Sequence, residues 1–114
     1  MSTTPAETGG DFARSAGVFA ALGDETRLSL IGKLSRGRPQ SISRLAKGSS
    51  LTRQAVTKHL LVLEAAGLVR SARTGREKQF ELRLEPLREL QSYLDRVSRQ
   101  WDEALDRLRS FVEC

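Results

Sequence analysis

The sequence predicts a mainly α-helical protein with one small β-hairpin, and three observations lead to this fold class. Apolar residues recur at helical spacing through most of the chain, and the spacing changes to alternation only over residues 68–83. The length of 114 residues suits a single domain. The composition, 39% hydrophobic and 29% charged, is that of a globular protein.

The N-terminal part is predicted to be a disordered tail followed by one helix. Residues 1–10 are small and polar, as is common at frayed chain ends. Residues 11–22 carry apolar side chains at helical spacing, and the domain proper is expected to span residues 11–114. One face of this first helix carries Phe12, Ala16, Phe19 and Ala20.

Three more helices are predicted in the middle of the chain. A second helix is expected over residues 25–35. Residues 41–66 contain a short helix, a tight turn and a longer helix that ends before Gly67, which is the pattern of a helix-turn-helix. Suitable N-cap residues for the three helices are Asp24, Ser41 and Thr52. The inward stripe of the longest of them is Val56, Leu60 and Leu63.

A β-hairpin directly after a helix-turn-helix is a wing, and residues 68–83 have that pattern. Two alternating segments flank a turn that contains Gly75. Three bases surround the turn, namely Arg73, Arg76 and Lys78. A basic hairpin tip can enter a minor groove or follow phosphates. The same charges could also serve only to prevent strand-to-strand aggregation.

A last helix is predicted over residues 87–112, with a heptad seam along it. Its apolar positions, separated by alternating steps of three and four, are Leu87, Leu90, Leu94, Val97, Trp101, Ala104, Leu108 and Phe111. Some 25 residues make a helix of roughly 38 Å, which is too long for so small a domain to cover. We therefore expect a homodimer, although packing within one domain is the alternative. The predicted dimer interface is Phe12, Phe19, Leu90, Leu94, Val97, Trp101 and Leu108.

The charge is distributed unevenly along the chain, which has a net charge of +5. Residues 27–80 contain twelve bases and two acids, a net charge of +10, whereas the segments before and after are net acidic. A basic middle segment favours a surface that binds a polyanion, although an ordinary solvated face is the alternative.

The helix of residues 53–66 offers side chains that can read bases. Opposite its inward stripe lie Arg53, Gln54, Thr57, Lys58 and Leu61. Arginine can pair with guanine and glutamine with adenine through two hydrogen bonds, and threonine can meet a base edge or a thymine methyl. Lysine is suited equally to a phosphate. These observations predict that the helix lies in a major groove of double-stranded DNA.

Three segments resemble the signatures of ArsR-type winged helix-turn-helix regulators. They are residues 21–27 (ALGDETR), 51–60 (LTRQAVTKHL) and 63–69 (LEAAGLV), and the resemblance extends over about residues 18–84. It implies that the DNA contacts of the reading helix are Thr52, Arg53, Gln54, Thr57 and Lys58. It also implies a homodimer formed through the first and last helices, and repression of transcription at palindromic operators.

The sequence departs from the family at two places. Ser49 and Ser50 make the turn more polar than the family's usual apolar residue and glycine. Metal-sensing members carry cysteine pairs in the helix that corresponds to residues 41–47 of this chain, or histidine and carboxylate pairs on the last helix. Neither set is present here, so we expect no metal site, no cofactor and no metal sensing through the usual sites. A small-molecule effector is not identified by the sequence.

The remaining functional residue types indicate structure rather than chemistry. His59, the one histidine, lies beside the inward stripe and is expected to be half-buried. Cys114, the one cysteine, is expected to be an inert tail residue. No nucleophile elbow or phosphate-binding loop is present, so an enzyme is not expected. Without an apolar span, a signal peptide or a cysteine pair, the sequence predicts a cytoplasmic protein without a membrane partner.

Two other classes of function remain open at the level of sequence. The heptad helix could recruit a different protein, with the basic surface incidental. A winged helix could also bind RNA, although Phe80 is the one aromatic residue in the basic segment available to stack on bases.

Overall fold

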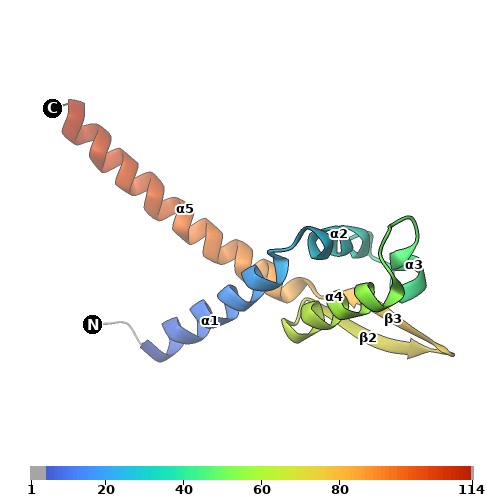
Figure 1. Cartoon of the computed structure of the whole chain (residues 1–114). Coiled ribbons are helices and arrows are strands. Elements are labelled where there is room, and N and C mark those ends of the chain that lie inside the picture. Colours follow the sequence, from blue (N-terminus) through green and yellow to red (C-terminus); the bar gives the residue numbers. More distant parts are fainter. Residues whose placement is uncertain (1–4, 114) are drawn as a thin grey trace.

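The computed structural model describes residues 5–113, with side chains from residue 13 onward. Figure 1 shows a helical body with a small sheet on one side and one long helix extending away from it. In chain order the elements are α1 (Pro5–Leu22), α2 (Glu25–Leu34), β1 (Gln40–Ser41), α3 (Ile42–Ala46), α4 (Arg53–Ala65), β2 (Val69–Thr74), β3 (Glu77–Leu82) and α5 (Leu84–Glu113). The predicted mainly helical fold with a hairpin wing is confirmed.

Local side-chain chemistry sets the ends of the central helices. The side chains of Asp24, Ser41 and Thr52 each accept a hydrogen bond from the backbone N–H three residues later, at 3.0, 3.2 and 3.0 Å. Each bond satisfies an amide that has no partner within its helix. Gly67, with a φ of 79°, follows the last turn of α4 in the left-handed conformation that glycine adopts without strain. The three predicted N-caps are confirmed.

The sheet has one more strand than predicted, in the order β1-β3-β2 with both pairings antiparallel. The hairpin brings Thr74 opposite Glu77, and Gly75 has a φ of 65° in the turn between them. The additional strand, β1, places Gln40 opposite Phe80. A strand of two residues is too short to show alternation, so only its pairing with β3 reveals it.

The core lies where α4 meets the other helices and the sheet. The stripe of Val56, Leu60 and Leu63 on α4 is fully buried, as predicted. Leu34, Leu45 and Phe80 pack into the same cluster. On α2 the buried residues are Leu30 and Leu34, four residues apart, whereas Leu28 is 53% exposed.

Both terminal helices begin earlier than predicted. The structure places residues 5–10, expected to be a disordered tail, in the first turns of α1 rather than starting the helix at residue 11. Residues 1–4 lie outside the described part. Pro5 is the first residue of α1, a position where its missing N–H costs no hydrogen bond. Likewise α5 begins at Leu84 instead of residue 87, because Pro86 fits within the first helical turn.

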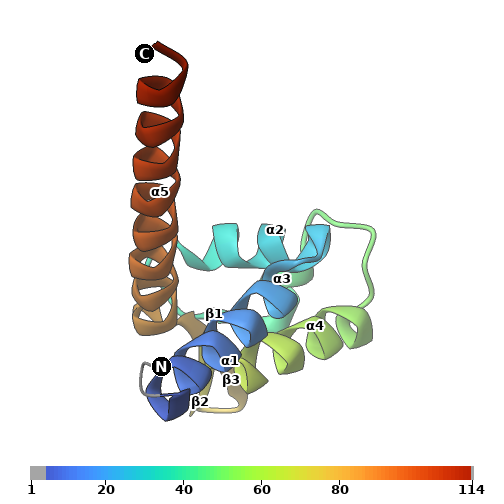
Figure 2. The same ribbon diagram turned by 90° about the vertical axis from the view of Figure 1, so that its left-hand side faces the viewer.

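The shape is elongated, with extents of 67 × 32 × 22 Å, because α5 continues beyond the body (Figures 1 and 2). Its first turns pack against α1, and Leu90 is the one buried residue of this helix. Figure 2 shows the rest of α5 standing clear of the other elements. None of the helices within residues 5–113 combines the length and apolarity that a membrane crossing requires.

Candidate nucleic-acid interface

The outward face of α4 is set by its buried stripe. Because Val56, Leu60 and Leu63 point into the core, the side chains of Arg53, Gln54 and Lys58 are exposed on the outside. None of these three takes part in an ion pair among residues 5–113. They are therefore available to an external partner.

The two threonines of the predicted set already have local partners. Thr52 is exposed, and its Oγ1 accepts the capping hydrogen bond from the N–H of Ala55. Thr57 is half-buried, and its hydroxyl donates to the carbonyl of Arg53 at 2.8 Å. The hydroxyl of Thr52 keeps its own proton to donate, so it can bond a phosphate without giving up the cap.

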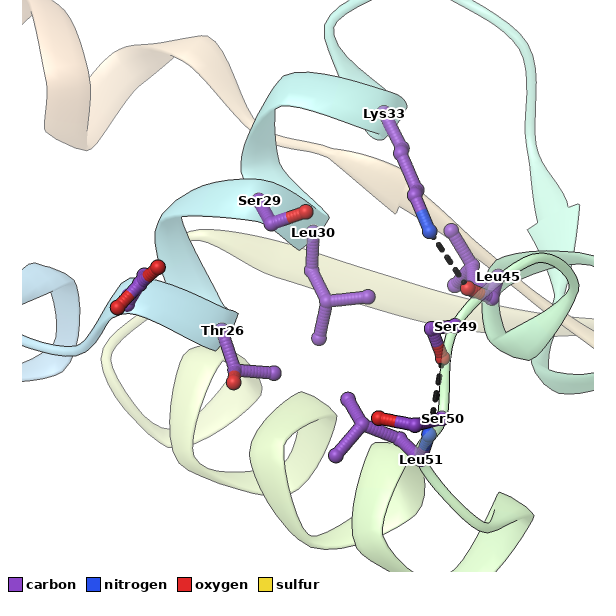
Figure 3. Close-up of a pocket in the computed structure, with 9 residues that line it drawn as sticks. Thr26, Ser29, Leu30, Lys33, Leu45, Ser49, Ser50 and Leu51 are labelled. Carbon is purple, nitrogen blue, oxygen red and sulfur yellow. Dashed lines mark hydrogen bonds between the residues drawn. The ribbon is translucent and has the colours of Figure 1, made fainter.

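The turn before α4 is held by serine hydrogen bonds. Ser49 Oγ donates to the carbonyl of Ala46 at 3.0 Å and accepts from the N–H of Leu51 at 3.2 Å. Nearby, Lys33 Nζ donates to the carbonyl of Leu45 at 3.0 Å, which ties α2 to α3 (Figure 3). Ser49, one of the two polar residues that depart from the family pattern, thus supplies two side-chain hydrogen bonds to the turn.

A hollow of about 340 Å³ lies between α2 and this turn. In Figure 3, Leu30, Leu45 and Leu51 lie around this hollow, together with small hydroxyl side chains from α2 and from the turn. The lining residues are Glu25, Thr26, Ser29, Leu30, Lys33, Leu45, Ser49, Ser50 and Leu51. A group bound in this hollow would contact the turn of residues 49–51, which directly precedes α4.

The wing concentrates positive charge at its tip. Arg73 lies directly opposite Lys78 on the paired strands, and Arg73 Nη1 donates to the carbonyl of Arg76 at 3.5 Å. Lys78 Nζ lies 5.5 Å from the centre of the Phe80 ring, within the range of a cation–π contact. Like charges opposite each other destabilise a hairpin, so this arrangement favours an anionic partner rather than stability.

Four further exposed bases lie near the wing and were missing from the predicted site. They are Arg36, Arg38, Arg44 and Lys47, on the loop after α2 and on or just after α3. Arg44 and Lys47 line a hollow that also includes Glu77 and Gln79 of β3. The signal was present in the strongly basic segment of residues 27–80, but only the fold brings the loop and α3 beside the wing.

His59 joins α4 to the corner between α1 and α2. Its Nδ1 lies 3.4 Å from Arg27 Nη1 and 3.8 Å from Asp24 Oδ2, and its side chain is half-buried, as predicted. The hydrogen bond from the backbone N–H of Arg27 and the charge of that arginine hold the pKa of Asp24 below its ordinary value, against partial desolvation. Arg27 also donates to the carbonyls of Ala20 and Ala21. These contacts link the middle of α4, at His59, to the corner between α1 and α2.

The predicted dimer residues are in different environments. Leu94, Trp101 and Leu108 on α5 are 45%, 64% and 58% exposed, and Phe19 on α1 is also exposed. Val97 is half-buried. Leu90 departs from the prediction, because it lies where α5 packs on α1 and is buried in the core of the same chain. The side chain of Phe12, and Cys114 entirely, lie outside the described part.

The exposed apolar surface of α5 is wider than the predicted seam. Leu105 and Val112, which lie outside the seam, are more than half exposed, as is Phe111 within it. Within residues 5–113, no three histidine, cysteine or carboxylate side chains lie close enough together to hold a metal ion.

Comparisons with known proteins agree with this geometry. A family described as helix-turn-helix domain matches residues 22–72. The uncharacterized HTH-type transcriptional regulator YuzN of Bacillus subtilis is 40% identical over 79 residues, which cover 64% of this chain and 86% of that protein. An ArsR-like transcriptional regulator from Rhodococcus sp. RHA1 has a similar structure, with a TM-score of 0.79, 39% identity, and coverage of 90% of this chain and 95% of the other.

A third similarity concerns the fold alone. A homodimeric winged helix-turn-helix DNA-binding domain from Mycobacterium bovis superposes with a TM-score of 0.65 at 20% identity, covering 94% of this chain and 95% of that one. The matched helix-turn-helix, the wing and the long last helix together place the protein: the chain belongs to the ArsR family of winged helix-turn-helix transcriptional regulators, which bind DNA.

Proposed function

We propose that the protein is a sequence-specific repressor that binds a pseudo-palindromic operator as a homodimer. The observation that carries this proposal is the exposed set of Arg53, Gln54 and Lys58 on α4, which forms no ion pair within residues 5–113 and lies beside a wing whose tip is cationic. One surface thus offers groups for base edges and groups for phosphates, which a specific DNA binder needs together.

Each contact has a role that its chemistry and position support. Arg53 and Gln54 lie in the first turn of α4 and read base edges in the major groove. Lys58, one turn further on, neutralises a phosphate, and Thr52 and Thr57 add hydroxyl contacts at the same end of the helix. The wing residues Arg73, Arg76 and Lys78 follow the adjacent minor groove or its backbone.

The homodimer is proposed from the exposed stripe of α5. Trp101 and Leu108 lie among several large apolar side chains that the body of the chain leaves uncovered. Phe19 on α1 adds to the apolar surface, and the similar M. bovis domain is homodimeric. Two copies joined through α5 and α1 would present two α4 helices related by a two-fold axis, which predicts an inverted repeat in the operator.

Repression would follow because a dimer bound over a promoter blocks access of the polymerase. The chain lacks the cysteine and histidine pairs of the family's metal sensors, so we propose that this blocking is not controlled through those metal sites. The proposal includes no cofactor and no catalytic residue.

The first experiment is selection of bound duplexes from a random DNA library, followed by titration of the selected duplex at several salt concentrations. We expect an enriched inverted repeat and a steep fall of log affinity with log salt concentration. Binding without any enriched motif would contradict sequence-specific recognition.

Single substitutions separate the two kinds of contact. Replacing Arg53 or Gln54 with alanine should cost about 1–3 kcal/mol on the selected site and relax the preference at one base position. Replacing Lys58 or Arg76 with alanine should weaken binding to all sequences and reduce the salt slope by about one. Arg99→Ala, on the exposed outer side of α5, is the control and should change neither.

The second candidate function, recruitment of a different protein by α5, is favoured by the same exposed stripe. Sedimentation of the purified chain distinguishes the two candidates. A dimer would show that a second copy covers the stripe, whereas a monomer that still exposes Trp101 would favour a different partner. RNA reading has less support, because Phe80 is buried and cannot stack on a base.

A further inference from the structure

A second cationic site lies on the loop between α2 and α3. Arg36, Arg38 and Arg44 line a hollow of about 280 Å³ together with Pro39 and Gln40. All three arginines are exposed, and no carboxylate belongs to the lining. None of the ion pairs within residues 5–113 involves them. Three arginines thus line one open space, and none of them is paired with a carboxylate within residues 5–113.

The local structure holds the backbone of this site in place. Gly37, with a φ of 88°, turns the chain after α2, and Gln40 Nε2 donates to the carbonyl of Lys33 at 2.9 Å. Gln40 belongs to β1 and lies opposite Phe80 of β3, and the next residue, Ser41, caps α3. Arg36 and Arg38 therefore project from a loop whose backbone is held in place, and Arg44 projects from the adjoining helix α3, which reduces the backbone entropy lost when they bind a ligand.

We propose that Arg36, Arg38 and Arg44 form a phosphate clamp that holds the DNA backbone outside the contact made by α4 and the tip of the wing. The flat, forked guanidinium group is suited to two hydrogen bonds with a phosphate, and it stays charged at every physiological pH. This inference rests on the proposed DNA binding and extends its footprint.

Continuity with the wing favours DNA phosphate over a free anion. An adjacent hollow shares Pro39, Gln40 and Arg44 with the clamp and reaches Lys47 at the end of α3 and Gln79 on β3. The clamp is therefore joined to the surface that lies between the helix-turn-helix and the wing. A DNA backbone that follows the wing would pass close to this site, because the two hollows share lining residues.

One acidic group limits where the phosphate can lie. Glu77 lines the adjacent hollow on the wing side, but not the hollow of the clamp. A phosphate should therefore sit toward Arg36 and Arg38, away from this carboxylate. Glu77→Gln removes the repulsion and should tighten DNA binding several-fold, on specific and non-specific duplexes alike.

The test compares two triple variants with the same charge change. The first replaces Arg36, Arg38 and Arg44 with glutamine, and the control replaces Arg88, Arg99 and Arg109, exposed on α5, with glutamine. Affinity is measured for the selected duplex with long flanks and for a trimmed duplex, over a range of salt concentrations. Far-UV circular dichroism and thermal unfolding confirm that both variants fold.

We expect the clamp variant to lose about tenfold or more in affinity for the long duplex, with a salt slope shallower by about two to three. The loss should be smaller on the trimmed duplex, and the control should match the wild type. A clamp variant with the slope of the control would overturn the inference while leaving the proposed function intact.

Two other outcomes are informative in the same experiment. Inorganic phosphate could raise the unfolding temperature of the wild type but not of the clamp variant, while the two proteins show the same salt dependence of DNA binding. In that case the hollow is a site for a free anion, and the proposed DNA clamp is wrong. If the wild type shows no sequence-specific binding, the proposed function fails first, and the clamp fails with it.

Discussion

Helices α4 and α5 each carry an apolar stripe, but the two stripes have opposite environments. On α4, Val56, Leu60 and Leu63 are fully buried against the rest of the chain. On α5, Trp101 is 64% exposed, and most of the large apolar side chains beyond Leu90 are likewise uncovered. The difference arises because α4 lies across the core, whereas α5 extends beyond it (Figure 1).

The two helices therefore depend on different surfaces for the burial of their apolar stripes. The stripe of Val56, Leu60 and Leu63 on α4 is fully buried within one chain, so the polar side chains on the opposite face are free to contact a ligand. Burial of the α5 stripe requires a second surface, since uncovered apolar area of this kind marks an interaction site. Helix α4 thus exposes hydrogen-bonding and charged side chains, whereas α5 exposes a stripe of large apolar side chains.

The largest expected effect is on α4. Leu60→Ala removes a fully buried side chain and should lower the free energy of unfolding by about 2–5 kcal/mol, as measured by urea denaturation. The neighbouring Leu61→Ala is the control, because Leu61 is half exposed and should change stability little. Equal losses at the two positions would show that the core is not packed as described.

The next effect is on α5. Trp101→Ala should weaken the proposed dimer by about 2 kcal/mol or more, a change of about 30-fold in the dissociation constant, because a central tryptophan commonly dominates an interface. Sedimentation equilibrium measures this change, and Arg99→Gln is the control on the outer side of the same helix. A wild type with an unfolding temperature independent of protein concentration would contradict the dimer.

A smaller effect is expected at the start of α4. Thr52→Ala removes the capping oxygen and should cost about 1 kcal/mol of stability, measured by thermal unfolding at fixed protein concentration. Thr52→Ser retains the oxygen and should restore most of the loss. If alanine and serine behave alike, the cap does not contribute to the stability of α4.

The smallest effect concerns the corner that fixes α4 to the body. Asp24 has a lowered pKa in the folded chain, so its charge stabilises the fold above the pKa of an unfolded aspartate. This contribution is lost as the pH falls through the folded pKa. Asp24→Asn keeps a capping oxygen but removes the charge.

The difference in unfolding temperature between wild type and Asp24→Asn should therefore be largest near neutral pH and shrink below about pH 4. Thermal unfolding from pH 7 downward measures this difference. A difference that grows on acidification would have the wrong sign for a lowered pKa.

Much of the recognition unit could be predicted from local chemistry. The caps Asp24, Ser41 and Thr52 act within one helical turn, and the buried stripe of α4 follows from the helical period alone. The wing turn depends on Gly75 and its immediate neighbours. Predictions of this kind hold because both partners lie within a few residues of each other.

Other features depended on contacts between distant residues. Local spacing alone could not show that Leu90 packs into the core while Leu94 remains exposed, since both lie on the predicted seam. The division follows from the packing of α1 on the N-terminal part of α5, where Arg14 forms an ion pair with Glu89 next to Leu90. The helical period likewise could not choose between Leu28 and Leu30 as the buried residue of α2.

The helix boundaries set by caps, the inward face of α4 and the chemistry of its outward face all follow from residues that are close together in the chain. The fold decided that β1 pairs with β3, and this pairing brings the hollow lined by Arg36, Arg38 and Arg44 beside the wing. The difference is one of range. Capping and helical period act over a few residues, whereas strand pairing and charge convergence depend on where the packed core places segments about 40 residues apart in the chain.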